Sequence, residues 1–333
     1  MKDIRIVFMG TPDFAVTILQ HLVENKYNVV GVITAPDKPA GRGRKLNQSA
    51  VKKYAISQNL PMLQPKNLKE EDFQEALINW NANLQIVVAF RMLPKTVWAM
   101  PKYGTFNLHA SLLPEYRGAA PINWAIINGE TKTGVTTFFI DDKIDTGEII
   151  LQKEIEIKES ETVGELHDKL MYLGADLVKE TVELIKKGEV CTTKQPEKEQ
   201  KPAHKLFPHN CKIDWSLSLN DIYNKIRGLN PYPAAWTNIH NGTDQISAKI
   251  YSVSKEKASH NLDIGTIVFS KLFLKVAVQD GYLIINDIKL SGKKKMDAKS
   301  LLNGFRFDDN AKDALTPLPV GSNSHTGFYR LGY

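Results

Sequence analysis

The stretch that decides the fold reads Phe106-Asn107-Leu108-His109-Ala-Ser-Leu-Leu-Pro114-Glu-Tyr-Arg-Gly-Ala-Ala-Pro121. Its first four residues alternate between apolar and polar, which is the period of a strand with one apolar and one polar face. Pro114 cannot donate a backbone hydrogen bond and so ends the strand, whereas Pro121 suits the first turn of a helix. We expect Asn107 and His109 to lie side by side at the end of this strand, where open α/β sheets bind ligands.

Strands and helices alternate over residues 1–189. Three apolar runs are typical of strands buried on both faces of a parallel sheet, and they span 4–9, 29–34 and 85–89. Thr162 and Glu165 form a capping box that opens a helix running through Leu184, and the domain ends near Gly188. Further helices are expected at 51–57, 71–79 and 120–128, with strands at 105–109 and 135–140. The pattern predicts a doubly wound, mostly parallel α/β sheet, a Rossmann-like domain.

The remainder of the chain has a different composition. Residues 190–209 are rich in Lys, Glu, Gln and Pro without periodicity, which is typical of a linker. Residues 210–315 contain about five short strands separated by turn signals such as Asn241-Gly242, which predicts a smaller OB-type β-barrel domain. Such barrels often bind nucleic acid. The tail, 316–333, has little pattern and no readable role.

Composition excludes several classes of protein. No apolar run approaches the ~20 residues of a membrane span, and the first residues lack a signal-peptide core, so we expect a cytoplasmic protein without a membrane partner. Gly10 stands alone after the first strand, which disfavours a dinucleotide cofactor. The two cysteines, Cys191 and Cys211, match no standard zinc spacing with the nearby histidines, and we expect no metal.

The charge is unevenly distributed along the chain. Residues 1–189 hold 23 Lys and Arg against 24 Asp and Glu, whereas residues 190–333 hold 20 against 13, a net charge of +7. A basic excess of this kind indicates a polyanionic partner, although solubility alone can also explain it.

A basic loop follows the second strand, at residues 35–45. By composition it is either a surface loop with solvated charges or a nucleic-acid contact. In the second interpretation Gly41 and Gly43 let the backbone approach a polyanion, while Arg42, Arg44 and Lys45 contact phosphates or bases.

The stretch from His109 to Pro121, with Asp145-Thr146-Gly147 downstream, resembles the signature of the folate-dependent formyltransferases. The resemblance covers nearly the whole chain. It implies transfer of a formyl group from 10-formyltetrahydrofolate, leaving tetrahydrofolate. Within the family the chain is most similar to members that formylate the α-amino group of methionyl initiator tRNA for translation initiation.

The resemblance also implies roles for individual residues. Asn107, His109 and Asp145 correspond to the catalytic residues. The residues expected to bind folate are Phe90, Arg91, Asp142, Ser111, Leu112, Leu113 and Pro114. Arg42, Arg44 and Lys45 fall in a loop that enters the acceptor arm of the tRNA, with Arg42 the strongest candidate for contacting the acceptor end. The family usually has Gly at positions 91 and 143; here Arg91 is free to pair with a carboxylate instead, and Lys143 changes the loop backbone.

Formyl transfer is an acyl transfer and needs donors at the developing oxyanion together with a route for protons. Asn107 offers a neutral N–H, and His109 can donate as an imidazolium that a nearby carboxylate, Asp145, would favour. Which of His109 and Asp145 is the formal acid or base stays open.

Two other functions stay open as well. One is a related formyltransferase that acts on a sugar nucleotide or another small amine, which would have no use for the basic loop. The other is a nonenzymatic RNA-binding protein. We expect a monomer.

Overall fold

The computed structural model describes residues 2–40, 45–196, 201–308 and 311–313. The chain divides into two compact units, residues 1–211 with 224–234 and residues 212–223 with 235–333. The boundaries expected from composition, at 189 and 210, stay predictions, and the stretch 224–234 joins the first unit although it follows the start of the second.

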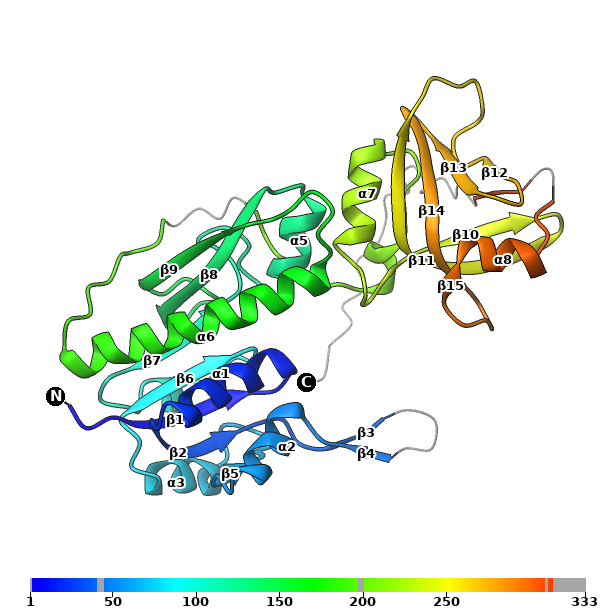
Figure 1. Ribbon diagram of the computed structural model, residues 1–333. Helices are drawn as coiled ribbons and strands as arrows, with labels where there is room; N and C mark the ends of the chain where they lie inside the picture. Colours follow the sequence, from blue (N-terminus) through cyan, green and yellow to red (C-terminus); the bar gives the residue numbers. More distant parts are fainter. Residues whose placement is uncertain (1, 41–44, 197–200, 309–310, 314–333) are drawn as a thin grey trace, which may run out of the picture. The chain divides into compact units, whose positions relative to one another are not determined.

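The described part of the first unit is built on one seven-stranded sheet (Figure 1). The strands from β5 to β7 are parallel to one another, and β8 and β9 extend the sheet as antiparallel strands. This confirms the doubly wound, mostly parallel sheet. The order across it is β5 (Met62–Leu63), β2 (Asn28–Ile33), β1 (Arg5–Gly10), β6 (Leu84–Val88), β7 (Thr105–His109), β8 (Lys132–Phe139) and β9 (Ile149–Glu156).

Helices cover both faces of this sheet. Alternate strand residues point to opposite sides, and the apolar ones on each side pack against helices. In β1, Ile6 and Phe8 pack with one core and Val7 and Met9 with the other. The first face carries α1 (Asp13–Glu24), α2 (Ala50–Ser57), α5 (Pro121–Ile127) and α6 (Val163–Lys187). The second carries α3 (Glu71–Asn79) and α4 (Lys95–Trp98).

Helix α6 begins where the sequence predicts. Thr162 and Glu165 form the reciprocal capping box, and Gly188 closes the helix in the left-handed conformation at φ 79°. In its interior Gly174 faces β7, where a Cβ atom would lie 2.8 Å from Leu108. The glycine therefore lets the helix pack closely beneath the strand that carries Asn107 and His109.

The basic loop is in part a ribbon. β3 (Lys38–Ala40) and β4 (Lys45–Asn47) pair antiparallel, which the sequence did not predict. Lys45 belongs to β4, whereas Arg42 and Arg44 lie outside the described residues.

The second unit is an antiparallel half-barrel, as expected for an OB-type domain. Its core includes the buried Trp215, whose indole N–H donates to the Thr237 hydroxyl at 3.0 Å. The strand order is β12 (Ile267–Phe269), β13 (Leu274–Val278), β14 (Gly281–Leu290), β11 (Asp244–Lys257), β10 (Ala235–Asn241) and β16 (Lys312–Asp313). β15 (Met296–Asp297) pairs with β14, and α8 (Ala298–Gly304) follows it. Helix α7 (Leu219–Arg227) is divided between the two units.

The capping box of α6 yields a prediction about stability. Thr162→Ala removes the hydroxyl that accepts from the backbone N–H of Glu165, and we expect the free energy of unfolding to fall by about 1 kcal/mol. Urea denaturation measures the change. Thr162→Ser keeps a hydroxyl and serves as the control; an equal loss in both variants would contradict the capping role.

Candidate active site

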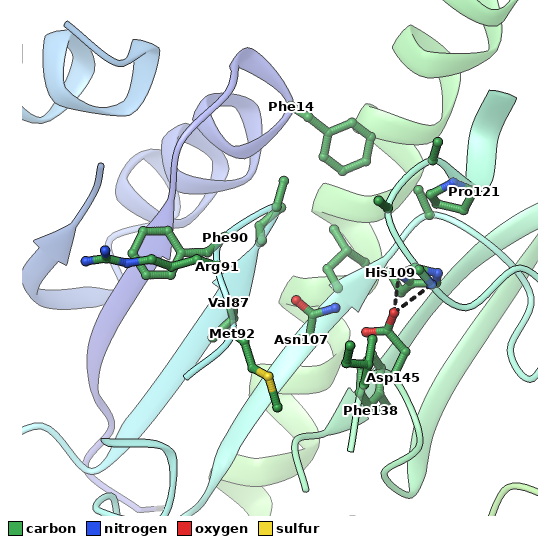
Figure 2. A pocket seen from close by; sticks show the side chains of 18 of the residues that line it. Phe14, Val87, Phe90, Arg91, Met92, Asn107, His109, Pro121, Phe138 and Asp145 are labelled. Carbon is green, nitrogen blue, oxygen red and sulfur yellow. Dashed lines mark hydrogen bonds and ion pairs between the residues drawn. The ribbon is translucent and has the colours of Figure 1, made fainter. Parts of the chain in front are cut away.

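A cavity of about 670 Å³ opens at the carboxyl ends of the central strands (Figure 2). In the sheet, β1 lies between β2, the next strand along the chain, and β6. The strand order therefore reverses between β1 and β6, which is the switch point of the sheet. Open α/β sheets bind ligands at that point. The lining includes Phe14, the segment 87–93 that ends β6, the end of β7, the segment 118–123 and much of the loop after β8.

Asn107 and His109 extend from β7 into this cavity (Figure 2). The period of two places both side chains on the same face of the strand, as the sequence predicts. His109 is 7% exposed and Asn107 half-buried. Asp145, from the loop after β8, lies below His109 and to the right of Asn107 in Figure 2, so the three residues predicted to be catalytic lie together in one cavity.

The two ring nitrogens of His109 face different oxygen atoms. Nε2 lies 2.8 Å from the backbone carbonyl of Tyr116 and Nδ1 lies 3.8 Å from Oδ2 of Asp145. A carbonyl oxygen can only accept a hydrogen bond, so Nε2 carries a proton. Nδ1 is therefore the nitrogen that faces the cavity and Asp145.

The loop before α5 holds this geometry through its backbone. Tyr116 has a left-handed backbone at φ 61°, which aims its carbonyl at His109, and the Gly118 N–H donates to Oδ2 of Asp145 at 3.0 Å. Gly118 itself has φ +122°, and a Cβ atom there would lie 2.6 Å from the Ala203 carbonyl oxygen. Only glycine fits this position without strain.

The loop that carries Asp145 is folded around another carboxylate. Asp141 accepts hydrogen bonds from the backbone N–H of Lys143 at 3.0 Å and from the hydroxyl of Thr146 at 2.8 Å. Asp145 is left-handed at φ 55°. A Cβ atom at Gly147 would lie 1.6 Å from the Phe139 carbonyl oxygen, so the loop returns to β8 only with glycine there.

The residues expected to bind folate divide into two groups. Phe90 and Arg91 line the cavity. The Arg91 guanidinium donates to the backbone carbonyls of Lys66, at 2.7 Å, and Pro65, so its hydrogen bonds go to the main chain and not to the carboxylate we expected. Burial lowers the pKa of this guanidinium, while Glu70 opposes the shift.

The second group does not line the cavity in the described structure, so its role in binding folate stays a prediction. It comprises Asp142, Ser111, Leu112, Leu113 and Pro114. Ser111 donates from its hydroxyl to the Glu115 carbonyl at 2.7 Å, and the Leu113 N–H donates to the Thr136 hydroxyl at 3.1 Å. These bonds fold the loop that carries Tyr116.

Sequence reasoning missed other residues of the cavity. Met92 and Ile144 line it with 66% and 63% of their surface exposed. Phe14 and His167 also line it and contact each other edge to face, with ring centroids 5.3 Å apart. None of these four residues belongs to a sequence motif that would identify it as part of a binding site.

Among the described residues, no group of three or more His, Cys, Asp or Glu side chains is placed to hold a metal ion. Within the same residues, no helix has the length and apolar character needed to cross a membrane.

Two family models match the chain over most of its length. The formyl transferase model matches residues 4–182, and the formyl transferase C-terminal domain model matches residues 205–306. The fold and the cavity are thus those of a formyltransferase.

Curated relatives narrow this class. The methionyl-tRNA formyltransferase of Flavobacterium psychrophilum is 59% identical over 93% of this chain and 99% of its own, and that of Bacteroides thetaiotaomicron is 53% identical over 93% and 98%. The chain therefore belongs to the methionyl-tRNA formyltransferases, within the formyl transferase family.

Solved structures share the fold at low identity. WlaRD, a sugar 3N-formyl transferase, superposes with a TM-score of 0.61 at 21% identity, over 88% of this chain and 100% of that one. HypX from Aquifex aeolicus superposes with a TM-score of 0.62 at 16% identity, over 90% of this chain and 47% of that one.

The side chain of Tyr116 gives a pH prediction. Its hydroxyl donates to Glu130 at 2.6 Å, and Lys201 donates to the same carboxylate at 2.6 Å. Burial acts to raise the pKa of the Glu130 carboxyl, but these two hydrogen bonds outweigh it and hold the pKa below its ordinary 4.5. Burial raises the pKa of the Tyr116 phenol well above 10, so the tyrosine remains a donor.

Because the folded pKa of Glu130 is lowered, its stabilising contribution is present above pH 4.5 and is lost as the pH falls through the folded pKa. We expect Glu130→Gln to lower the melting temperature at pH 6 to 7, with the difference from wild type shrinking toward pH 3. The loss at neutral pH should correspond to about 0.5–1 kcal/mol, as for a partly exposed ion pair. Melting curves across this range measure it, and a constant difference at every pH would contradict the assignment.

Proposed function

We propose that the protein transfers the formyl group of 10-formyltetrahydrofolate to the free α-amino group of methionyl initiator tRNA. One observation carries the proposal: Asn107, His109 and Asp145 lie together in one cavity at the end of β7, in a chain of this family. An amide, an imidazole and a carboxylate can together stabilise the oxyanion of an acyl transfer and move its proton.

The reaction exchanges one carbon–nitrogen bond for another. The amine nitrogen attacks the formyl carbon, and the carbonyl oxygen becomes an oxyanion. The bond from that carbon to N10 of the folate then breaks, N10 takes up a proton, and the attacking nitrogen loses one. The site must therefore stabilise one negative oxygen and move one proton from the attacking to the leaving nitrogen.

Asn107 and His109 serve the oxyanion. The Asn107 amide donates without any requirement on pH. His109 is held by the Tyr116 carbonyl, to which Nε2 donates, so that Nδ1 is the nitrogen turned toward the substrate and Asp145. Each well-placed donor of this kind contributes about 3 kcal/mol to the transition state.

Asp145 takes part in the proton transfer. Its Oδ2 accepts from the Gly118 N–H and lies 3.8 Å from Nδ1 of His109, so the two groups can face the same reacting atoms. The carboxylate takes the proton that the amine loses and returns it, directly or through His109, to N10 of the folate. His109 and Asp145 thus act as a pair with shared protons, and neither holds the role of acid or base alone.

The cavity suits the folate donor. Its volume lies in the range of small-molecule sites, and apolar side chains form much of its wall. Phe90, Arg91 and the exposed Met92 follow β6, and Ile140 and Ile144 belong to the facing loop. WlaRD was crystallised with 5-N-formyl-THF and HypX with tetrahydrofolic acid, which supports a folate in this fold.

The proposal that tRNA is the partner is supported by the charge of the chain and by the names of its relatives. Both curated relatives are named for methionyl-tRNA, and residues 190–333 carry a net charge of +7. Arg42, Arg44 and Lys45 remain proposed contacts to the acceptor arm. The enzyme is proposed to act as a monomer.

The catalytic assignment predicts the outcome of a formylation assay. With 10-formyltetrahydrofolate and methionyl initiator tRNA, we expect His109→Ala and Asp145→Asn to lower kcat at least a hundredfold, because each removes a group that acts on the oxyanion or on the proton in the transition state. His21→Ala is the matched control, since His21 lies 3.7 Å from Asp176 and lines no part of the cavity. Full activity of His109→Ala would overturn the assignment. No transfer to tRNA by wild type that still binds folate would favour a small amine as substrate.

The tRNA contact predicts a salt dependence. If the basic residues bind phosphates, tRNA affinity falls steeply with salt, with a log–log slope close to minus the number of contacts. Arg42→Ala should weaken binding and reduce that slope by about one. Lys186→Ala serves as the control because the Lys186 backbone bonds to Lys2, near the opposite ends of the strands. A flat salt response would contradict a phosphate contact.

A further inference from the structure

The segment that composition marks as a linker lies against both loops of the catalytic pair. Its described parts are 190–196 and 201–209. Thr193 exchanges two backbone hydrogen bonds of 2.8 Å with Ile149, just after the Asp145 loop. On the other side the Tyr116 N–H donates to the Lys201 carbonyl at 2.7 Å. The segment is therefore joined to the loop that aims the Tyr116 carbonyl and to the loop that holds Asp145.

One buried side chain, Gln195, connects the two loops directly. It is 6% exposed. Its Oε1 accepts from Nη2 of Arg117 at 2.7 Å and from Nε at 3.2 Å, and its Nε2 donates to the carbonyls of Asp145 at 3.1 Å and Gly147 at 2.7 Å. An amide has two donor hydrogens and an oxygen with two lone pairs, so every hydrogen-bonding position of Gln195 is used.

The bonds of Gln195 bear on the backbone of Asp145 itself. A non-glycine residue in the left-handed region is strained unless its surroundings hold it there, and Asp145 has φ 55°. The carbonyl of that residue is fixed by Gln195, and its carboxylate is fixed by the N–H of Gly118, the residue after Arg117. Arg117 is itself 8% exposed and also donates to the Pro196 carbonyl. The Gln195 amide is therefore held by a side chain that is itself buried and hydrogen-bonded.

We propose that Gln195, seated on Arg117, is a positioning residue that sets the orientation of Asp145 toward His109 for formyl transfer. The inference rests on the proposed function, in which the charge of Asp145 acts on His109. Gln195 lines no part of the cavity and touches no reacting atom, so it acts only through the loops that it joins.

Two substitutions separate positioning from simple stability. Gln195→Glu keeps an acceptor for Arg117 but replaces both N–H donors by a carboxylate oxygen facing two carbonyls. Gln195→Met keeps the approximate volume and removes all four hydrogen bonds. The matched control is Asn83→Leu: Asn83 is also a buried amide, accepting from the Arg5 N–H and donating to the Asp3 carbonyl, at the opposite end of β6.

The experiment measures kcat, the KM values for folate and tRNA, and the melting temperature of each full-length variant. A one-ångström misplacement of catalytic groups costs up to a hundredfold in rate, so we expect both Gln195 variants to lose about tenfold to a hundredfold in kcat. KM values should stay within about threefold, since binding is not what is lost. Asn83→Leu should lower the melting temperature and keep kcat within about twofold of wild type.

Unchanged kcat in Gln195→Glu, with His109→Ala inactive, would overturn the positioning role and leave the proposed function standing. So would a kcat loss in Asn83→Leu as large as in the Gln195 variants. If wild type forms no formylmethionyl-tRNA, the proposed function fails, and a crystal structure of Gln195→Glu then decides this proposal. A carboxylate of Asp145 displaced from the Gly118 N–H supports it, and an unmoved carboxylate overturns it.

Discussion

The hydrogen bond from His109 to the Tyr116 carbonyl is the constraint on which the site depends. A carbonyl cannot donate, so Nε2 carries the proton of that hydrogen bond and Nδ1 faces Asp145. The carbonyl reaches the ring because Tyr116 is left-handed, and the loop keeps that shape through its own bonds and through the Lys201 carbonyl. A strand residue thus receives its protonation pattern from the loop that follows it.

The rest of the first unit places that loop at the carboxyl ends of the parallel strands. The parallel strands from β5 to β7 bring their carboxyl ends together, and the switch point between β1 and β6 leaves space for a ligand there. β8 runs antiparallel to β7 and ends opposite Phe106, and the loop that follows it brings Asp145 back to His109. Two loops of different origin therefore meet over one strand, and the buried amide of Gln195 lies where they approach each other.

The sequence predicted those features that depend on local periodicity and on a specific motif. The strand 105–109 and the helix 71–79 have the expected bounds, and Asn107, His109 and Asp145 lie together as the motif implies. It could not show how the loop 111–114 folds, because the residue types fit a cavity wall and a buried turn equally well. Arg91 bonds to the carbonyls of residues 65 and 66, an approach between distant segments that no local pattern encodes. Gln195 was hidden for another reason: one buried amide in a run of Lys, Glu, Gln and Pro has no periodicity to distinguish it.

The most direct test of the account is a single-turnover measurement on Asn107→Ala with saturating 10-formyltetrahydrofolate and methionyl initiator tRNA. In the proposed mechanism the Asn107 amide only donates to the oxyanion, so the rate of the formyl-transfer step should fall by about a hundredfold to a thousandfold. The folate dissociation constant, measured in parallel, should change by less than about threefold. An unchanged transfer rate, or a loss explained entirely by weaker folate binding, would contradict the claim that this cluster stabilises the transition state.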